Sequence, residues 1–226
     1  MEEHVEFWSK VAARYDSIID RQMGSDNRRR LRERIAAEKE TFGCAAEFGC
    51  GTGFFTDVIA SRSESVIAVD LAPGMIEVAR TRCRAAKITF RNEDCQKTSI
   101  ASASLDTVFL SLVIHFTEPA STLSEMRRLL KPGGMVVVIN LDPLALGALR
   151  RLCAQVRILY YGITGYRTKP PRNFSKNIIS ACDLSSLLVQ SGFRNVSVEL
   201  FKSSDRFSDV PIELIKAISS DERPRH

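Results

Sequence analysis

Short apolar runs alternate along the chain with segments whose apolar residues recur at helical spacing. Apolar runs with the length and composition of β-strands lie at 45–48, 65–69, 87–91, 105–111 and 135–141. Helical spacing is found between them, at 53–61, 73–85 and 118–130. The run at 135–141 is almost entirely apolar, which is typical of a parallel strand covered on both faces. This alternation predicts an α/β fold.

The two ends of the chain and one internal segment depart from this alternation. The spacing predicts a helix at 5–20 and a second, strongly charged helix at 27–39. Residues 142–179 break the pattern, with an amphipathic helix expected at 144–161 and then a loop rich in Gly, Pro and basic residues. The final expected elements are a helix and two strands, at 182–191, 195–201 and 210–218. We expect one domain, 1–226, with an N-terminal helical lid (1–40) and an inserted lid (142–179) between the fifth and sixth strands.

A glycine-rich turn follows the first expected strand. Its sequence is Glu47-Phe-Gly-Cys-Gly-Thr-Gly53, and the acid Asp70 ends the next strand. Glycines at alternate positions let the backbone bend sharply and approach a bulky ligand. A strand, a glycine turn, a helix, a second strand and an acid make up a nucleoside-binding unit, in which the acid accepts the ribose hydroxyls.

The spacing of the glycines and the acid before them indicate which nucleoside ligand the turn would bind. A dinucleotide site has the pattern G-x-G-x-x-G, but here Phe54 stands at the last position and the third glycine comes one residue early. Glu47 would repel a pyrophosphate and suits a ligand with an ammonium group, such as S-adenosylmethionine (SAM). Together with the segments 69–80 and 105–140, the pattern E-x-G-x-G-x-G resembles the class I SAM-dependent methyltransferase family, of the type 11/25 kind.

The resemblance implies a fold and a cofactor. The fold is a three-layer Rossmann-like sandwich, with a seven-stranded, mostly parallel sheet whose last strand is antiparallel. The cofactor is SAM, with S-adenosylhomocysteine (SAH) as its product. Residues 7–16, with Asp20, also look like the opening of the ubiquinone/menaquinone C-methyltransferases, in which Tyr15 would close over the methionine end of SAM. The glycine turn and residues 140–174 depart from that subfamily, which leaves a quinone acceptor in doubt.

Ligands of open α/β sheets bind beyond the carboxyl ends of the strands. Asp70 is therefore expected to accept hydrogen bonds from both ribose hydroxyls. Leu71 and Met75 are expected to enclose the adenine. By resemblance, Asp94 would accept from the adenine amino group with Cys95 alongside, and Ser111 would lie beneath the sulfonium. A turn former and a buried strand end are the structural alternatives for Asp94 and Ser111. The expected cofactor residues are Tyr15, Glu47, Gly49, Cys50, Gly51, Thr52, Gly53, Asp70, Leu71, Met75, Asp94, Cys95 and Ser111.

The acceptor is less well defined by the sequence. His115, just past the fourth strand, is the candidate base, although a histidine that only fills space is at least as common there. His4 is a weaker candidate because chain termini fray. Aromatic residues suited to hold a ring or shield the sulfonium complete the expected substrate site, which comprises Trp8, His115, Tyr160, Tyr161 and Tyr166.

Several absent motifs narrow the acceptor further. The fourth strand is not followed by the Asp/Asn-Pro-Pro-aromatic turn of amino methylation, and no Pro-Cys pair suggests cytosine chemistry. No acid at the end of that strand would hold a magnesium ion, so no metal is expected. The sequence therefore favours methylation of a small, lipophilic acceptor. Two alternatives stay open: a NAD-binding oxidoreductase, disfavoured by the early third glycine, and a non-catalytic SAM-binding regulatory subunit.

Composition adds little that conflicts with this interpretation. A chain of 226 residues, 44% hydrophobic, can bury one sizeable core, and its formal charge of +5 is mild. The basic runs are most simply solvated helix faces, but they leave peripheral contact with an anionic membrane open. No module that reads a specific nucleic acid is recognisable. The six cysteines include no C-x-x-C pair, which suits the reducing cytoplasm. We expect a cytoplasmic monomer or homodimer.

Overall fold

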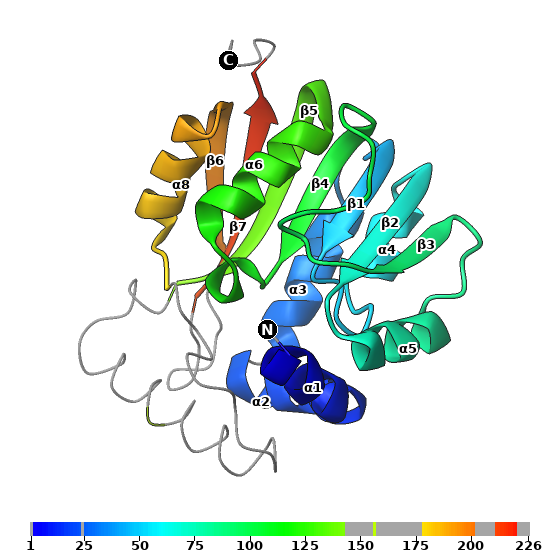
Figure 1. Cartoon of the computed structure of the whole chain (residues 1–226). Coiled ribbons are helices and arrows are strands. Elements are labelled where there is room, and N and C mark those ends of the chain that lie inside the picture. The colour runs from blue at the N-terminus through cyan, green and yellow to red at the C-terminus, as the bar shows by residue number, and fades with distance from the viewer. Residues whose placement is uncertain (1, 24, 143–155, 157–177, 202–210, 221–226) are drawn as a thin grey trace.

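The computed structural model describes residues 2–23, 25–142, 156, 178–201 and 211–220. Its centre is a seven-stranded sheet with the order β3-β2-β1-β4-β5-β7-β6 (Figure 1). The strands are β1 (Cys44–Phe48), β2 (Ser65–Asp70), β3 (Ile88–Asn92), β4 (Leu105–Ser111), β5 (Leu130–Leu141), β6 (Phe193–Phe201) and β7 (Ile212–Ser219). The first five pair in parallel, whereas β7 is antiparallel to both β5 and β6. The expected α/β architecture with a reversed last strand is therefore confirmed.

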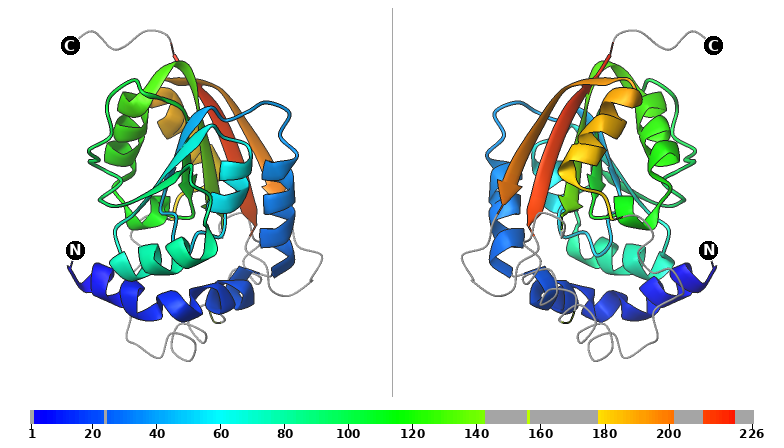
Figure 2. Two further views of the ribbon diagram at one scale, coloured as in Figure 1. Left: turned by 90° about the vertical axis from the view of Figure 1, so that its right-hand side faces the viewer. Right: turned by 90° about the vertical axis from the view of Figure 1, so that its left-hand side faces the viewer.

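Helices cover both faces of the sheet, so the domain has three layers (Figure 2). They are α1 (Glu2–Val11), η1 (Ala12–Arg14), α2 (Tyr15–Met23), α3 (Ser25–Ala36), α4 (Thr56–Ser61), α5 (Pro73–Arg82), η2 (Ile114–Phe116), α6 (Pro119–Leu129) and α8 (Ala181–Gln190). Successive strand residues point to opposite faces, and two separate apolar clusters follow from this alternation. On one face Val108 and Val138 pack with α6 and α8. On the other Phe109 and Val137 pack with α3 and α4.

The N-terminal helices lie across the carboxyl ends of the parallel strands (Figure 1). Phe7 and Val11 of α1 are buried in a small cluster with Met75 of α5. The close approach of these helices depends on Gly74, because a Cβ at that position would lie 2.8 Å from the Ser9 Cα and carbonyl oxygen. The Gly74 N–H donates to Ser9 Oγ at 3.3 Å. The α1 helix is therefore packed directly on the first turn of α5.

The chain between β3 and β4 crosses the sheet without a helix of its own. Residues 93–104, all of them described, contain only turns and bends. They are fixed to α6 by the buried Glu125, whose Oε1 accepts hydrogen bonds from the Thr98 N–H and hydroxyl, both at 2.7 Å. Arg128 also donates to the Ile100 carbonyl at 3.0 Å. The beginning of this segment leads directly into the candidate site.

Three expected boundaries are wrong for identifiable reasons. The single helix expected at 5–20 is divided by the 3₁₀ turn η1 into α1 and α2. The helix expected at 53–61 begins only at Thr56, because Gly53 has φ +78° and cannot be helical. The fifth strand begins at Leu130 rather than Met135, since Leu130 pairs with Leu105 across an irregular register. Apart from residue 156, the helix expected at 144–161 lies outside the described residues, as does most of the inserted segment 142–179.

No helix in the part of the chain that the structure describes is both long and apolar enough to cross a bilayer.

Candidate active site

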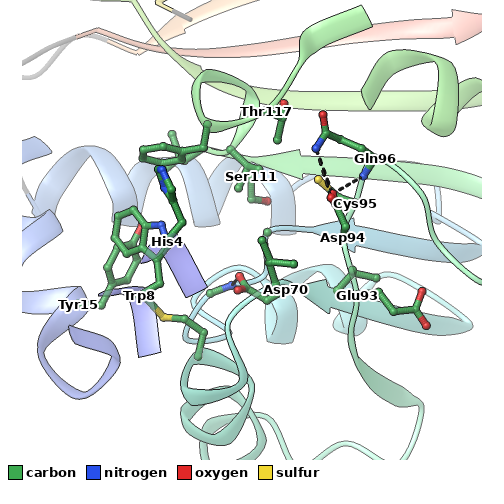
Figure 3. A pocket seen from close by; sticks show the side chains of 18 residues that line it. His4, Trp8, Tyr15, Asp70, Glu93, Asp94, Cys95, Gln96, Ser111 and Thr117 are labelled. Carbon is green, nitrogen blue, oxygen red and sulfur yellow. Dashed lines mark hydrogen bonds between the residues drawn. The ribbon is translucent and has the colours of Figure 1, made fainter. Parts of the chain in front are cut away.

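A cavity of about 300 Å³ lies at the carboxyl ends of β1, β2 and β4, between these strands and the N-terminal helices (Figure 3). It brings together ten of the residues expected from the sequence: Trp8, Tyr15, Gly49, Gly51, Asp70, Leu71, Met75, Asp94, Cys95 and Ser111. Eight further residues line it that were not in the expected cofactor and substrate sets, although His4 was named as a weaker candidate base: His4, Val69, Glu93, Gln96, Leu112, Val113, Phe116 and Thr117. Segments far apart in the sequence therefore meet at the place where α/β sheets bind ligands.

The glycine turn forms one wall of the cavity with its backbone. Gly49, Gly51 and Gly53 have φ values of +67°, +51° and +78°, which L side chains rarely adopt. The N–H groups of Gly49 and Cys50 both donate to the Val69 carbonyl, at 2.8 and 3.0 Å, and so fasten the turn to β2. A Cβ on Gly49 would lie 1.9 Å from Val113 Cγ2. The turn therefore requires glycine at position 49 for space as well as for conformation.

Asp70 occupies the end of β2 and is held by backbone donors on both oxygens. The Gly51 N–H donates to Oδ2 and the Ala72 N–H to Oδ1, each at 2.9 Å. The Asn92 amide donates to the Asp70 and Leu71 carbonyls at 2.9 and 2.8 Å, which fixes the loop behind the carboxylate. Burial raises the pKa of Asp70, and the backbone hydrogen bonds partly offset that effect. The result is a carboxyl group in a fixed orientation at the cavity wall (Figure 3).

Asp94 and its neighbours form the wall on the β3 side. The Gln96 N–H donates to Asp94 Oδ1 at 2.9 Å, and the Gln96 side-chain amide donates to both Asp94 oxygens at 3.3 and 3.4 Å (Figure 3). The side-chain oxygen of Gln96, Oε1, accepts from the Glu118 N–H at 2.9 Å. Gln96 therefore links Asp94 to the start of α6. The sequence contains no local signal for this link, since it depends on a contact across 22 residues.

Glu47 lies one layer behind the cavity. Its side chain is fully buried, and its oxygens accept from Thr56 Oγ1 at 2.6 Å and Ser111 Oγ at 2.8 Å. Burial raises the pKa of Glu47 to about 8, against the lowering effect of the two hydroxyl donors. Burial therefore favours the protonated form of this acid at neutral pH. It reaches the cavity through Ser111, which is itself a lining residue.

Three other residues of the glycine turn are not among the lining residues. Cys50 is buried against Ala79 and Phe90 on the opposite side of the turn. The Thr52 hydroxyl donates to Asp16 Oδ1 at 2.9 Å. A Cβ on Gly53 would lie 2.8 Å from Cys83 Sγ, so Gly53 permits the turn to pack on α5. These residues shape the turn from behind.

His115 is not brought into the lining either. Its ring packs on Phe116 at a centroid distance of 4.0 Å, within η2. Burial lowers the pKa of His115 to about 4, so the ring is neutral at physiological pH and only weakly basic. The geometry therefore gives little support to a base role for His115. The remaining expected substrate residues, Tyr160, Tyr161 and Tyr166, lie outside the described residues.

Aromatic side chains form the wall opposite the strand ends. Trp8 makes edge contacts with Tyr15 and Phe116, at centroid distances of 5.7 and 5.3 Å. These contacts connect the N-terminal helices to η2. His4, one turn before Trp8 on α1, also lines the cavity (Figure 3). An imidazole and several ring faces are thus presented to the same space.

The sequence matches known proteins over much of its length. Residues 46–138 match the profile of the family described as "Methyltransferase domain". The bifunctional biotin biosynthesis protein BioHC of Cellvibrio japonicus is 35% identical over 152 residues, covering 66% of this chain and 29% of that protein. A malonyl-[acyl-carrier protein] O-methyltransferase of Paenibacillus sp. is 26% identical over 225 residues, covering 95% of this chain and 79% of that protein. A ubiquinone biosynthesis O-methyltransferase of Cereibacter sphaeroides is 32% identical over 99 residues, covering 42% and 40%. The chain thus spans less than two thirds of BioHC and of the Cereibacter protein.

Solved structures share the fold. A SAM-dependent methyltransferase of Thermotoga maritima, described as a possible histamine N-methyltransferase, superimposes with a TM-score of 0.66 at 19% identity, covering 95% of this chain and 99% of that one. The N-methyltransferase NodS of Bradyrhizobium japonicum, solved with SAH, gives a TM-score of 0.63 at 16% identity, covering 91% and 97%. At these identities the likeness concerns the fold alone.

Proposed function

Because the chain belongs to the class I SAM-dependent methyltransferase family, we propose that the cavity binds SAM and that the enzyme methylates an oxygen atom of a small, lipophilic acceptor. The choice of oxygen is supported by the curated relatives, which are named O-methyltransferases. The walls of the cavity support this arrangement, since fixed polar groups lie on one side and aromatic rings on the other.

The observation that carries the cofactor proposal is the carboxylate of Asp70, fixed at the end of β2 beside the glycine turn. A carboxylate offers about four acceptor sites, so Asp70 can accept from the two ribose hydroxyls beside its hydrogen bonds from the Gly51 and Ala72 N–H groups. Leu71 and Met75 would enclose the adenine, and Asp94 would accept from its amino group. Tyr15 and Gly49 would face the methionine portion, with Ser111 beneath it and Glu47 behind. Because burial raises its pKa to about 8 and it lies behind Ser111, the charge of Glu47 does not decide between SAM and a pyrophosphate.

SAM, when bound, supplies a methyl group attached to a positively charged sulfur. When the methyl group is transferred, the sulfur departs as part of a neutral thioether. The protein then has to orient the acceptor oxygen in line with that methyl group and exclude water. Trp8, Tyr15 and Phe116 present apolar surface for this purpose. An acceptor that loses a proton on methylation needs a base, and His4 lines the cavity whereas His115 does not. We therefore favour His4 as the proton acceptor for a phenol, whereas a carboxylate acceptor would need no base.

The cofactor proposal is tested by isothermal titration of the protein with SAM, SAH and NAD. We expect SAM and SAH to bind and NAD not to bind. Asp70→Ala should weaken SAM by roughly 2–4 kcal/mol, about 30- to 700-fold in Kd, because two charge-assisted hydrogen bonds are lost. Asp70→Asn is the matched control for shape, and thermal unfolding checks that the turn is intact. Wild-type binding of NAD in place of SAM would contradict the proposal.

Catalysis requires a separate measurement. Incubation with methyl-labelled SAM and a panel of small phenols and carboxylic acids, free or as carrier-protein thioesters, should give label in at least one product. SAM binding without transfer to any acceptor would favour a regulatory subunit instead.

A further inference from the structure

A charged junction joins the glycine turn to the N-terminal helices. Asp16, on α2, accepts at Oδ1 from the Thr52 hydroxyl and from Arg28 Nη2, both at 2.9 Å. Its Oδ2 accepts from Arg82 of α5. Arg82 in turn donates to the Thr52 hydroxyl and carbonyl at 3.0 and 3.1 Å. One carboxylate thus connects three elements that are separate in the sequence.

Arg28 shows that this junction is a built feature of the interior. Its side chain is 2% exposed, and it is paired with Asp16 and with Asp20, the latter at 2.6 Å. Its guanidinium also lies 3.6 Å from the centroid of the Phe54 ring, within the range of cation–π contacts. A buried charge is tolerated only when it is well paired, so the loss of Asp16 would leave Arg28 poorly compensated. Burial raises the pKa of Asp16, but hydrogen bonds from Arg82 and Arg28 outweigh that effect and hold it below its ordinary value.

The residue beside this junction faces the cavity. Tyr15 precedes Asp16, lines the cavity and contacts Trp8. The Tyr15 ring also lies against the glycine turn, since a Cβ on Gly51 would be 3.8 Å from its Cε1. The backbone that carries Tyr15 is therefore fixed by Asp16 to the same turn that would hold the cofactor.

We propose that Asp16 is a positioning residue that binds Thr52 and Arg82 and thereby holds Tyr15 over the methionine end of the cofactor. This inference rests on the proposed binding of SAM. It adds Asp16 as a residue that affects SAM binding through Tyr15. A purely structural role for Asp16 would lower stability and would affect SAM binding to the same extent whether or not the Tyr15 ring is present. A positioning role makes the effect depend on that ring.

A double-mutant cycle distinguishes the two roles. The Kd for SAM is measured by titration calorimetry for wild type, Asp16→Asn, Tyr15→Ala and the double variant, with thermal unfolding recorded for each. We expect Asp16→Asn to weaken SAM about tenfold in the wild-type background and by less than about twofold in the Tyr15→Ala background. Equal losses in both backgrounds, or unchanged affinity in either single variant, would overturn the proposal.

Thr52→Val provides a milder test should Asp16→Asn fail to fold. It removes the hydroxyl that donates to Asp16 and keeps the Arg28 pair and the side-chain shape. It should show the same dependence on Tyr15 with a smaller loss. Asp26→Asn is the matched control, because Asp26 pairs with Arg29 on an exposed helix face, and its SAM affinity should be unchanged. Failure of wild type to bind SAM would refute the proposed function itself, whereas wild-type binding that is insensitive to Asp16 and Thr52 would refute only this inference.

Discussion

The two walls of the cavity are built in different ways. The strand-end wall consists of Gly49, Gly51 and Asp70, which are positioned by backbone torsion angles and backbone hydrogen bonds. The aromatic wall consists of Trp8 and Phe116, which meet only because α1 packs on α5 and lies beside η2. The first wall is therefore determined by a short segment of sequence, and the second by the docking of distant segments.

This difference teaches how one fold serves many acceptors. A ligand common to a family can be bound by a local motif, whereas the acceptor is selected by whatever the fold places opposite to it. Substitutions in the strand-end wall should therefore affect folding and cofactor affinity. Changes in the aromatic wall should affect the acceptor.

The largest effect is expected at Gly49. Gly49→Ala places a Cβ 1.9 Å from Val113 Cγ2 at φ +67°, and strain and overpacking together should cost roughly 2–5 kcal/mol of unfolding free energy. Gly51→Ala is the matched control: its φ is similar, at +51°, but the nearest atom is 3.8 Å away, so about 1–2 kcal/mol is expected. Urea unfolding of both variants measures the difference. Equal losses would mean that the Val113 contact does not constrain the turn.

An intermediate effect, which depends on pH, is expected at Glu47. Its pKa is about 8 in the folded protein and near 4.5 when unfolded, so the folded state alone keeps the proton between these values. The free energy of unfolding should therefore fall as the pH rises through this window, by a few kcal/mol. Glu47→Gln, which is never charged, should lose less stability than wild type between pH 5 and pH 8. Parallel stability curves for the two proteins would show that Glu47 is ionised in the folded state.

The smallest effect is expected at His115. His115→Gln should keep kcat/KM within about twofold of the wild-type value above pH 6, because desolvation already lowers the pKa of this ring to about 4 and the ring lies outside the lining. His4→Gln should lower kcat about tenfold or more for a phenolic acceptor and leave SAM affinity unchanged. Steady-state kinetics of the two variants measures this contrast. A loss at His115 and none at His4 would restore the base role expected from the sequence.

The sequence predicted the sheet well because strand length and apolar content are local properties. The β4 strand was predicted at its observed bounds, and β1, β2 and β3 within one residue. The start of β5 was missed, since Lys131-Pro132-Gly133-Gly134 resembles a helix stop and only the pairing of Leu130 with Leu105 extends the strand. A helix at 5–20 was predicted from a continuous apolar stripe, which contains no signal for the 3₁₀ turn at Ala12–Arg14.

In the candidate site, too, residues placed by local sequence were predicted, and residues placed by contacts between distant segments were missed. The places of Asp70, Gly49 and Gly51 in the cavity lining were predicted from spacing, because they follow from chain direction and torsion angles. Gln96, Phe116 and Thr117 were missed, because their place in the lining depends on how the segments after β3 and β4 fold back. His4 was undervalued because its closeness to the chain end suggested fraying. The packing of α1 on α5 instead brings His4 to the cavity.

The helix-free crossing between β3 and β4 has a consequence for dynamics. Asp94 lies in the helix-free segment 93–104, whose local opening is opposed by the contacts of Glu125 and Arg128 with Thr98 and Ile100 and by the hydrogen bond between Gln96 and Glu118. Amide hydrogen exchange at 94–100 should therefore report the integrity of α6, some thirty residues further along the chain. The stability of α6, which packs on one face of the sheet, would in this way influence how long the adenine of bound SAM stays enclosed.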